Sequence, residues 1–206
     1  TAPSEIFASG IDYEYRTSDQ EYTVRRCGKC GHLFVDPRPP MADIKTLYPQ
    51  TYYTINPASP LFLKGLIYEV KKRQDVRRIL AWVRRFGIRS ILDIGCGDVE
   101  KLVSLRKNLS GLPVRLLGID LQFSQVIKDK ARAHGIVLLE ANIDDYEFPP
   151  EFEKVDFILV SQLMEYLVAP DRVLDKLSQI LHPQGKMLIE TPNSGGLDFV
   201  LFHRRH

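Results

Sequence analysis

Gly95 and Gly97 are the residues whose type and spacing point most directly to ligand binding in this sequence. They follow the apolar stretch from Ser90 to Ile94, and a helical pattern begins at Glu100. A strand that runs into Gly-x-Gly and then into a helix brings bare backbone against a ligand at the carboxyl edge of a parallel sheet. Glycine is needed there because a Cβ atom would block both the turn and the close approach.

Carboxylates around this loop discriminate between two classes of ligand. Dinucleotide sites use Gly-x-Gly-x-x-Gly and place a diphosphate at the helix N-terminus. Here Glu100 stands at the third glycine position, and Asp93 and Asp98 add further negative charge. Three carboxylates would repel a diphosphate. The sequence therefore predicts a cationic ligand and disfavours a nicotinamide dinucleotide.

A second group of reactive side chains lies in Cys27-Gly28-Lys29-Cys30, with His32 close by. The Cys-x-x-Cys spacing is typical of a metal knuckle, but zinc in a structural site takes four ligands. Two thiols and one imidazole make half a zinc site unless other residues join them. The other interpretation is a pair of free thiols in a tight turn, and the sequence leaves both open.

Strand and helix patterns alternate from Ser90 onward. The expected strands span residues 90–94, 114–119, 136–139, 155–160 and 186–190, and the expected helices span 100–109, 124–134 and 170–181. Near-continuous apolar strands separated by helices predict a parallel sheet covered on both faces. The predicted fold class is thus α/β, a Rossmann-like, doubly wound, mostly parallel sheet. A turn at Pro183-Gln184-Gly185 is expected to precede the last strand.

Two further regions precede this alternating domain, which we place at residues 88–206. Residues 1–60 form a small, irregular segment that is rich in Tyr and Pro, with two short strands expected at Val24–Cys27 and Leu33–Val35. Residues 61–87 predict a linking amphipathic helix. Its polar face carries many Lys and Arg residues, which is either a solvated face or a patch for a phosphorylated or nucleic-acid partner. No aromatic residues alternate with these charges to stack bases, so a nucleic-acid partner is not indicated.

Five pieces of the chain, in this order, resemble the class I S-adenosylmethionine-dependent methyltransferases. They are Leu92-Asp93-Ile94-Gly95-Cys96-Gly97, Asp120 at the end of the second strand, Asn142-Ile143-Asp144, the strand Val155–Val160, and Leu181-His182-Pro183-Gln184-Gly185. The resemblance implies S-adenosyl-L-methionine as cofactor, with Asp93 near its ammonium and Asp120 on its ribose hydroxyls. The implied cofactor-binding residues are Asp93, Gly95, Cys96, Gly97, Asp120, Leu121, Asn142, Ile143, Asp144, Ser161 and Gln162.

The resemblance also implies an acceptor site. Glu165 and Tyr166 follow the fourth strand and are the expected catalytic residues. The Cys-x-x-Cys segment ahead of the domain resembles a bacterial subgroup that often acts in glycan and surface-polysaccharide pathways. The expected acceptor is a small molecule or a glycan, methylated at oxygen, and Cys27 and Cys30 are the candidate metal ligands.

Three departures from the family pattern keep other functions open. Val99 stands where the family has a third glycine, and it is expected to crowd the cofactor loop. Tyr166 replaces a frequent histidine, and the chain stops at His206, before two further strands that the family fold adds. The alternatives are a degenerate methyltransferase fold that serves as a binding module, and an RNA methyltransferase.

Composition excludes several other classes of protein. The chain has 206 residues, of which 44% are hydrophobic and 26% charged, with a formal net charge of +2. These values are ordinary for globular domains and exclude a disordered chain or a coiled coil. No apolar run is long enough to span a bilayer, and no signal peptide is visible. Three cysteines form no disulfide framework, which predicts a reducing, cytoplasmic location.

Overall fold

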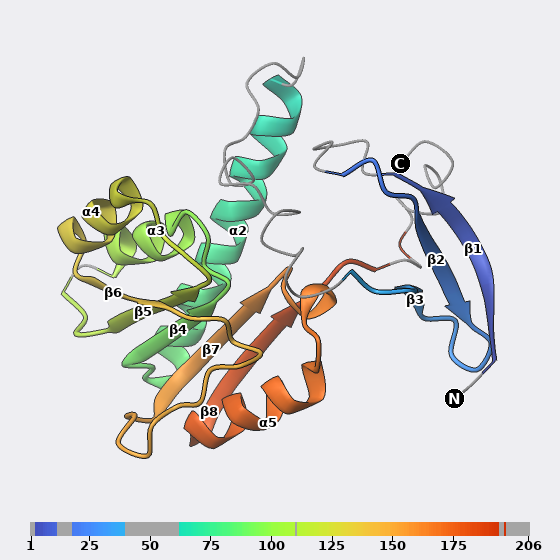
Figure 1. Cartoon of the computed structure of the whole chain (residues 1–206). Coiled ribbons are helices and arrows are strands. Elements are labelled where there is room, and N and C mark those ends of the chain that lie inside the picture. The colour runs from blue at the N-terminus through green and yellow to red at the C-terminus, as the bar shows by residue number, and fades with distance from the viewer. Residues whose placement is uncertain (1–2, 12–17, 40–61, 110, 194–195, 197–206) are drawn as a thin grey trace. The chain divides into compact units, whose positions relative to one another are not determined.

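The computed structural model describes residues 3–11, 18–39, 62–109, 111–193 and 196. The chain divides into two compact units, the first made of Thr1–Ser59 with Ser194–His206 and the second of Pro60–Asn193 (Figure 1). The Tyr- and Pro-rich stretch at 40–60, and with it the predicted boundary at 60/61, lies outside the described residues.

The first unit contains a three-stranded antiparallel sheet. Its strands are β1 (Ser4–Gly10), β2 (Tyr22–Cys27) and β3 (Leu33–Val35), in the order β1-β2-β3. The two short strands predicted around the Cys-x-x-Cys turn are confirmed. The strand β1 was not predicted, because most of its residues are exposed and its sequence alternates only weakly. Part of the segment expected to be irregular is therefore a regular sheet.

The second unit is built on a five-stranded sheet in which every pair of neighbours is parallel. The order β6-β5-β4-β7-β8 confirms the predicted Rossmann-like α/β sheet. The strands are β4 (Ser90–Ile94), β5 (Arg115–Asp120), β6 (Ile136–Glu140), β7 (Val155–Ser161) and β8 (Leu181–Glu190). The central strand β4 is buried along its whole length, as a strand covered on both faces must be.

Helices cover both faces of this sheet (Figure 1). They are α2 (Phe62–Phe86), α3 (Glu100–Asn108), α4 (Gln125–Ala133) and α5 (Pro170–Ile180), with a short 3₁₀ helix, η2 (Met164–Tyr166). Side chains alternate between two cores, since Ile91 packs with α2, α3 and α4, whereas Leu92 packs with α5. Figure 1 shows α5 on the opposite side of the sheet from the other helices.

The long helix predicted at 61–87 is confirmed as α2. Its side chains Val76, Ile79, Leu80 and Val83 are buried in the core that α3 and the sheet share. The helix is thus an integral part of the second unit, in addition to any role as a link. Its apolar spacing of three and four residues matches this packing.

The strand β8 begins earlier than expected. Leu181 already pairs with Val155, and the next pair is Phe157 with Lys186. The predicted turn at Pro183-Gln184-Gly185 is therefore an irregularity inside the strand instead of a connection before it. This bulge lies at the amino end of the sheet, where it helps to line the cavity described below.

Within the described ranges, no helix combines the length and hydropathy that a membrane-spanning segment needs.

Candidate functional site

The carboxyl ends of the parallel strands bring together polar residues that are far apart in the sequence. Asp93, Asp120, Ser161 and Glu190 stand near or at the ends of β4, β5, β7 and β8. Ligands of open α/β sheets bind at this edge. We therefore treat it as the candidate site.

The glycine loop turns sharply between β4 and α3. Gly95 and Gly97 have φ angles of 72° and 55°, in the left-handed region that favours glycine. The backbone N–H groups of Gly95 and Cys96 donate to the Ile119 carbonyl oxygen at 2.8 and 3.2 Å. A Cβ atom on Gly95 would also lie 3.2 Å from the Leu163 side chain. The loop is thus held against β5 and packs closely against the segment that follows β7.

Asp120 fastens this loop from the neighbouring strand. One carboxylate oxygen accepts from the Gly97 N–H at 2.8 Å, and the other accepts from the Leu121 N–H at 2.8 Å. The residue is buried. Its carboxylate thus links the glycine loop to the end of β5.

Asp93 is a buried carboxyl group at the end of β4, and its exposed fraction is 2%. Burial raises its pKa to about 6, because a charge is poorly solvated there; Lys101 opposes the rise, while Asp120 and Glu190 add to it. A cation bound beside Asp93 would favour its ionised form. Binding of a positively charged ligand would therefore lower the pKa of Asp93.

A chain of polar contacts crosses the same edge. The Lys101 ammonium donates to the Ser161 hydroxyl at 2.8 Å, and this hydroxyl donates to a Glu190 carboxylate oxygen at 2.9 Å. The other Glu190 oxygen accepts from Arg78 of α2 at 2.6 Å. Burial opposes ionisation of Glu190, but the bonds from Arg78 and Ser161 and the nearby Lys101 outweigh it, so its pKa lies below the ordinary value.

Sequence reasoning missed Lys101, Glu190 and Arg78 as members of the site. Lys101 lies in the first turn of the helix after the glycine loop, and Glu190 is the last residue of β8. Lys101 falls in the first turn of a predicted helix and Glu190 at the end of a predicted strand. A carboxylate at a strand end could therefore have indicated that Glu190 belongs to the site. Their pairing requires the strand order β4-β7-β8, which the sequence pattern did not specify.

Cys96 packs into the core under the loop. A Cβ atom on Gly118 would lie 2.6 Å from the Cys96 sulfur, so the thiol occupies the space that this glycine leaves open. Burial, with the charges of Asp93 and Asp120, raises the pKa of the Cys96 thiol. The group stays protonated and acts as a packing residue, which leaves only its backbone to face a ligand.

The loop after β6 uses its polar side chains internally. Asn142 donates to Asp145 at 2.8 Å and accepts from the Asp144 N–H at 3.2 Å. Asp144 accepts from the backbone N–H groups of Val168 and Ala169 at 3.0 and 3.2 Å. Ile143 is buried in the core on the α5 side. These contacts shape the loop, and the adenine contacts expected of these residues remain a prediction.

Val99 differs from the expectation that its side chain crowds the cofactor loop. It has a φ angle of 59°, so it adopts the left-handed conformation that favours glycine. Its side chain is fully buried and packs in the core with residues of α2 and α3. The residue immediately precedes α3. Its departure from glycine therefore strains the backbone instead of filling the open side of the loop.

The predicted catalytic residues lie on η2, just after β7. Glu165 accepts a hydrogen bond from the Thr191 hydroxyl at 3.2 Å, and Tyr166 is 40% exposed. Gln162, between β7 and η2, has a φ angle of 51°, and its N–H donates to the Glu190 carbonyl oxygen at 2.7 Å. A residue other than glycine in this left-handed conformation indicates local backbone strain, which is frequent at functional sites.

The Cys-x-x-Cys turn lies in the first unit, between β2 and β3. The pKa of Cys27 is lowered, chiefly by the backbone N–H of Cys30, then by that of Lys29 and by the Cys30 side chain. Among the residues that the structure describes, no group of three His, Cys, Asp or Glu side chains could hold a metal ion. The described part of the turn therefore offers two thiols and no complete zinc site.

A family model described as a methyltransferase domain matches residues 66–204. The matched range contains the glycine loop, Asp120, the polar chain from Lys101 to Glu190, and η2. The chain belongs to this methyltransferase family. The match confirms the predicted class of enzyme, a methyltransferase, at the level of the family. The subgroup with an N-terminal Cys-x-x-Cys remains a prediction.

Solved structures of methyltransferases are similar to this chain at low identity. Coclaurine N-methyltransferase, bound to N-methylheliamine and S-adenosylhomocysteine, is 22% identical, with a TM-score of 0.46 over 56% of this chain and 33% of its own. An S-adenosylmethionine-dependent methyltransferase from Mesorhizobium loti is 25% identical, with a TM-score of 0.41 over 50% and 46%. The plantazolicin methyltransferase BamL, in complex with a desmethylPZN analogue and S-adenosylhomocysteine, is 19% identical, with a TM-score of 0.49 over 68% and 53%.

The chain thus spans between a third and about half of the length of these solved proteins. No curated protein sequence matches it. The assignment to the methyltransferase family rests on the match of residues 66–204 to the family model.

Proposed function

We propose that this chain binds S-adenosylmethionine at the carboxyl edge of its parallel sheet and transfers the methyl group to a small-molecule or glycan-type acceptor, at oxygen. The observation that carries the proposal is the pair of opposite charges beside the glycine loop. Asp93 is buried at the end of β4, and Lys101 stands in the first turn of α3. The methionine end of the cofactor carries an ammonium and a carboxylate, so these two side chains complement it.

Asp120 and Leu121 suit the nucleoside end of the cofactor. Asp120 stands at the end of β5 and is bonded to the glycine loop through the Gly97 N–H, and the two oxygens of a carboxylate are suited to accept from two ribose hydroxyls. Leu121 is 42% exposed and offers an apolar surface beside it. Ile143 belongs to the loop after β6, and its side chain packs in the core on the α5 side. Recognition of adenine by Asn142 would exchange its bond to Asp145 for one to the ligand.

The cofactor, when bound, supplies a methyl group on a sulfonium whose departure leaves a neutral sulfur. The protein then has two tasks. It must hold the acceptor in line with the methyl group, which is mainly an effect of orientation, and it must accept a proton from an acceptor hydroxyl. We assign the second task to Glu165, whose carboxylate has one described hydrogen bond, from Thr191. Tyr166 would contact the acceptor.

The choice of acceptor rests on the first unit. A Cys-x-x-Cys turn between two short strands precedes the methyltransferase domain, as in the subgroup that the sequence resembles. This feature supports a glycan or related small molecule and a cytoplasmic location. If the protein binds the cofactor but transfers no methyl group to any acceptor, the alternative of a binding module without activity is favoured.

Calorimetric titration of the purified chain with S-adenosylmethionine tests the proposal, with NAD as a control ligand. We expect the first to bind and the second not to. Asp120→Ala should weaken binding by about 1.5–3 kcal/mol, the range for hydrogen bonds to a charged group. Asp129→Ala, which removes an exposed carboxylate on α4, is the matched control and should leave affinity unchanged. Unaltered binding in Asp120→Ala would refute the ribose assignment.

A further inference from the structure

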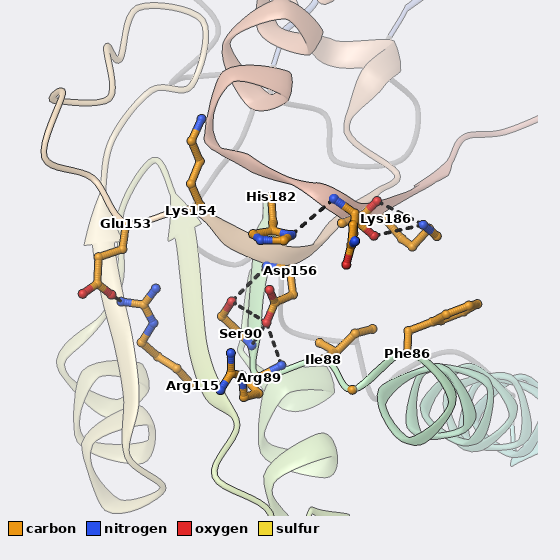
Figure 2. Close-up of a pocket in the computed structure, with 13 residues that line it drawn as sticks. Phe86, Ile88, Arg89, Ser90, Arg115, Glu153, Lys154, Asp156, His182 and Lys186 are labelled. Atoms are coloured by element: carbon orange, nitrogen blue, oxygen red, sulfur yellow. Dashed lines mark hydrogen bonds and ion pairs between the residues drawn. The ribbon is translucent and has the colours of Figure 1, made fainter.

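A polar cavity of about 470 Å³ lies at the amino edge of the five-stranded sheet, opposite the edge that carries the candidate cofactor residues (Figure 2). The segment after α2, the first residues of β4 and β5, the residues before and at the start of β7, and the bulge of β8 line it. The proposed methyl transfer uses none of these residues. Volumes of this size are typical of sites for small molecules.

Positive charge predominates in the lining. Four cationic side chains face two carboxylates: Arg89, Arg115, Lys154 and Lys186 against Glu153 and Asp156. Arg115 forms an ion pair with Glu153. Lys154 donates to the Gln179 carbonyl oxygen at the end of α5, so it also has a structural task. Three lining cations, Arg89, Lys154 and Lys186, have no ion pair with a carboxylate among the described residues.

Arg89 is the cation that most clearly lacks a structural task. Its backbone N–H donates to the Asp156 carboxylate at 2.7 Å, but its guanidinium has no hydrogen bond or ion pair with any residue that the structure describes. The residue is exposed. A guanidinium presents a fork of donors that matches a phosphate group in a bidentate arrangement.

Lys186 and His182 add donors on the β8 side of the cavity, and Figure 2 shows His182 beside Asp156 and the Lys186 ammonium directed toward the backbone of Gln184 and Gly185. The Lys186 ammonium donates to the Gln184 carbonyl oxygen at 3.0 Å and lies 5.5 Å from the centre of the Phe86 ring. These contacts position the charge without cancelling it. His182 Nδ1 accepts from the Gln184 N–H at 3.2 Å, so the proton of a neutral ring is on Nε2, which can donate.

Asp156 is the negative group that an anionic ligand would meet. One of its oxygens accepts three hydrogen bonds, from the N–H groups of Arg89 and Ser90 and from the Ser90 hydroxyl, at 2.7, 3.0 and 3.2 Å. These donors offset its charge on the side of β4. Its other oxygen can accept from a ligand hydroxyl. The cavity therefore combines cations with an acceptor for a hydroxyl group.

We propose that this cavity binds a small phosphorylated ligand with hydroxyl groups, with Arg89 as the main phosphate-binding residue and Lys186 and His182 as further donors in the lining. A phosphate dianion would offset two of the three cations that have no carboxylate partner. The cavity is much larger than a single ion, so the ligand carries further atoms, and a phosphorylated polyol fits the polar lining. The inference does not depend on methyl transfer, because the site lies at the other edge of the sheet.

Calorimetric titration of the full chain with ribose 5-phosphate, inorganic phosphate and ribose tests this proposal. We expect ribose 5-phosphate to bind more tightly than inorganic phosphate, and ribose not to bind. Arg89→Gln should weaken binding of ribose 5-phosphate at least about tenfold, as expected for loss of a charged hydrogen-bond donor. Arg172→Gln removes an exposed arginine of α5 and should leave the affinity unchanged.

Melting temperatures of both variants verify folding, and Arg89→Gln is expected to melt as the parent does, because its side chain has no described partner. No binding of either phosphate probe to the parent chain would overturn the proposal. Equal losses in Arg89→Gln and Arg172→Gln would also overturn it, since they would indicate an effect of net charge alone. Titration with S-adenosylmethionine in the same variants keeps the two sites distinct, and Arg89→Gln should leave that affinity unchanged.

Discussion

Asp93 is a carboxyl group that the fold keeps out of water, and this makes stability depend on pH. Its pKa is raised to about 6 by burial, above the ordinary value near 3.9. The stability that the protonated form contributes is complete below pH of about 4 and is lost as pH rises through 6. The difference between these two pKa values corresponds to about 3 kcal/mol in the free energy of unfolding. The ligand-free protein thus carries a buried charge at neutral pH that a cationic ligand would compensate.

We expect Asp93→Asn to remove most of this loss between pH 4.5 and 7.5, because the amide does not ionise. Urea denaturation at the two pH values measures the free energy of unfolding of parent and variant. Asp175→Asn, on the exposed face of α5, is the control and should follow the parent profile. A parent profile unchanged in Asp93→Asn would show that Asp93 does not titrate in this range.

Val99 holds a backbone conformation that valine seldom adopts, and its buried side chain offsets the strain. Left-handed backbone costs an L-residue about 1–2 kcal/mol, whereas burying a valine side chain contributes at least about 1.5 kcal/mol. Val99→Gly relieves the backbone strain but loses the burial of the side chain, so the two changes in the free energy of unfolding oppose each other. Val103 lies inside α3 and is also buried. Val103→Gly loses the burial of the side chain without relieving any backbone strain, and glycine inside a helix lowers stability further, by about 0.5–1 kcal/mol.

We therefore expect Val99→Gly to be more stable than Val103→Gly by about 2 kcal/mol. The two variants match in the atoms removed, so chemical denaturation of both isolates the backbone effect. Titration of Val99→Gly with S-adenosylmethionine should give the affinity of the parent, because the side chain packs in the core. Tighter binding would mean instead that Val99 obstructs the cofactor loop.

At the scale of elements, α2 joins the core through one face. Ile79 is 1% exposed in the core, whereas Val70 of the same helix is 46% exposed. Ile79→Ala should lower the free energy of unfolding by about 2–5 kcal/mol, the usual range for a buried isoleucine. Val70→Ala should change it by less than about 0.5 kcal/mol, as surface substitutions do. Comparable effects of the two substitutions in urea denaturation would contradict the packing of α2 against the sheet.

The elements that the sequence predicted best are those with continuous apolar runs or regular spacing. The strands β4 to β7 and the helix α2 were placed within one or two residues, because burial on both faces or on one stripe leaves a clear pattern. The sequence predicted that Gly95 and Asp120 lie close together, because each stands at the carboxyl end of a strand in one parallel sheet. The exposed strand β1 left no such pattern. The link from Lys101 to Glu190 depends on strand order, and the cavity at the amino edge depends on a bulge in β8, so neither could be read from local sequence.

At the scale of the whole molecule, the candidate metal residues and the proposed methyl-transfer site belong to different compact units. Cys27 belongs to the first unit, whereas the glycine loop belongs to the second. Each unit is stabilised by its own sheet. Loss of the Cys27 thiol should therefore leave the proposed cofactor site intact.

Metal content provides the test at this scale. Structural zinc takes four ligands, and the described residues offer only the two thiols of Cys27 and Cys30 at the turn. We expect zinc to be substoichiometric in the purified chain, to be removed by EDTA, and to leave the melting temperature unchanged. Cys27→Ser should lower residual zinc without altering the affinity for S-adenosylmethionine, and Cys96→Ser, in the second unit, is the control for zinc content. Stoichiometric zinc that resists EDTA would show that further ligands complete the site, since two thiolates alone cannot close a tetrahedral shell.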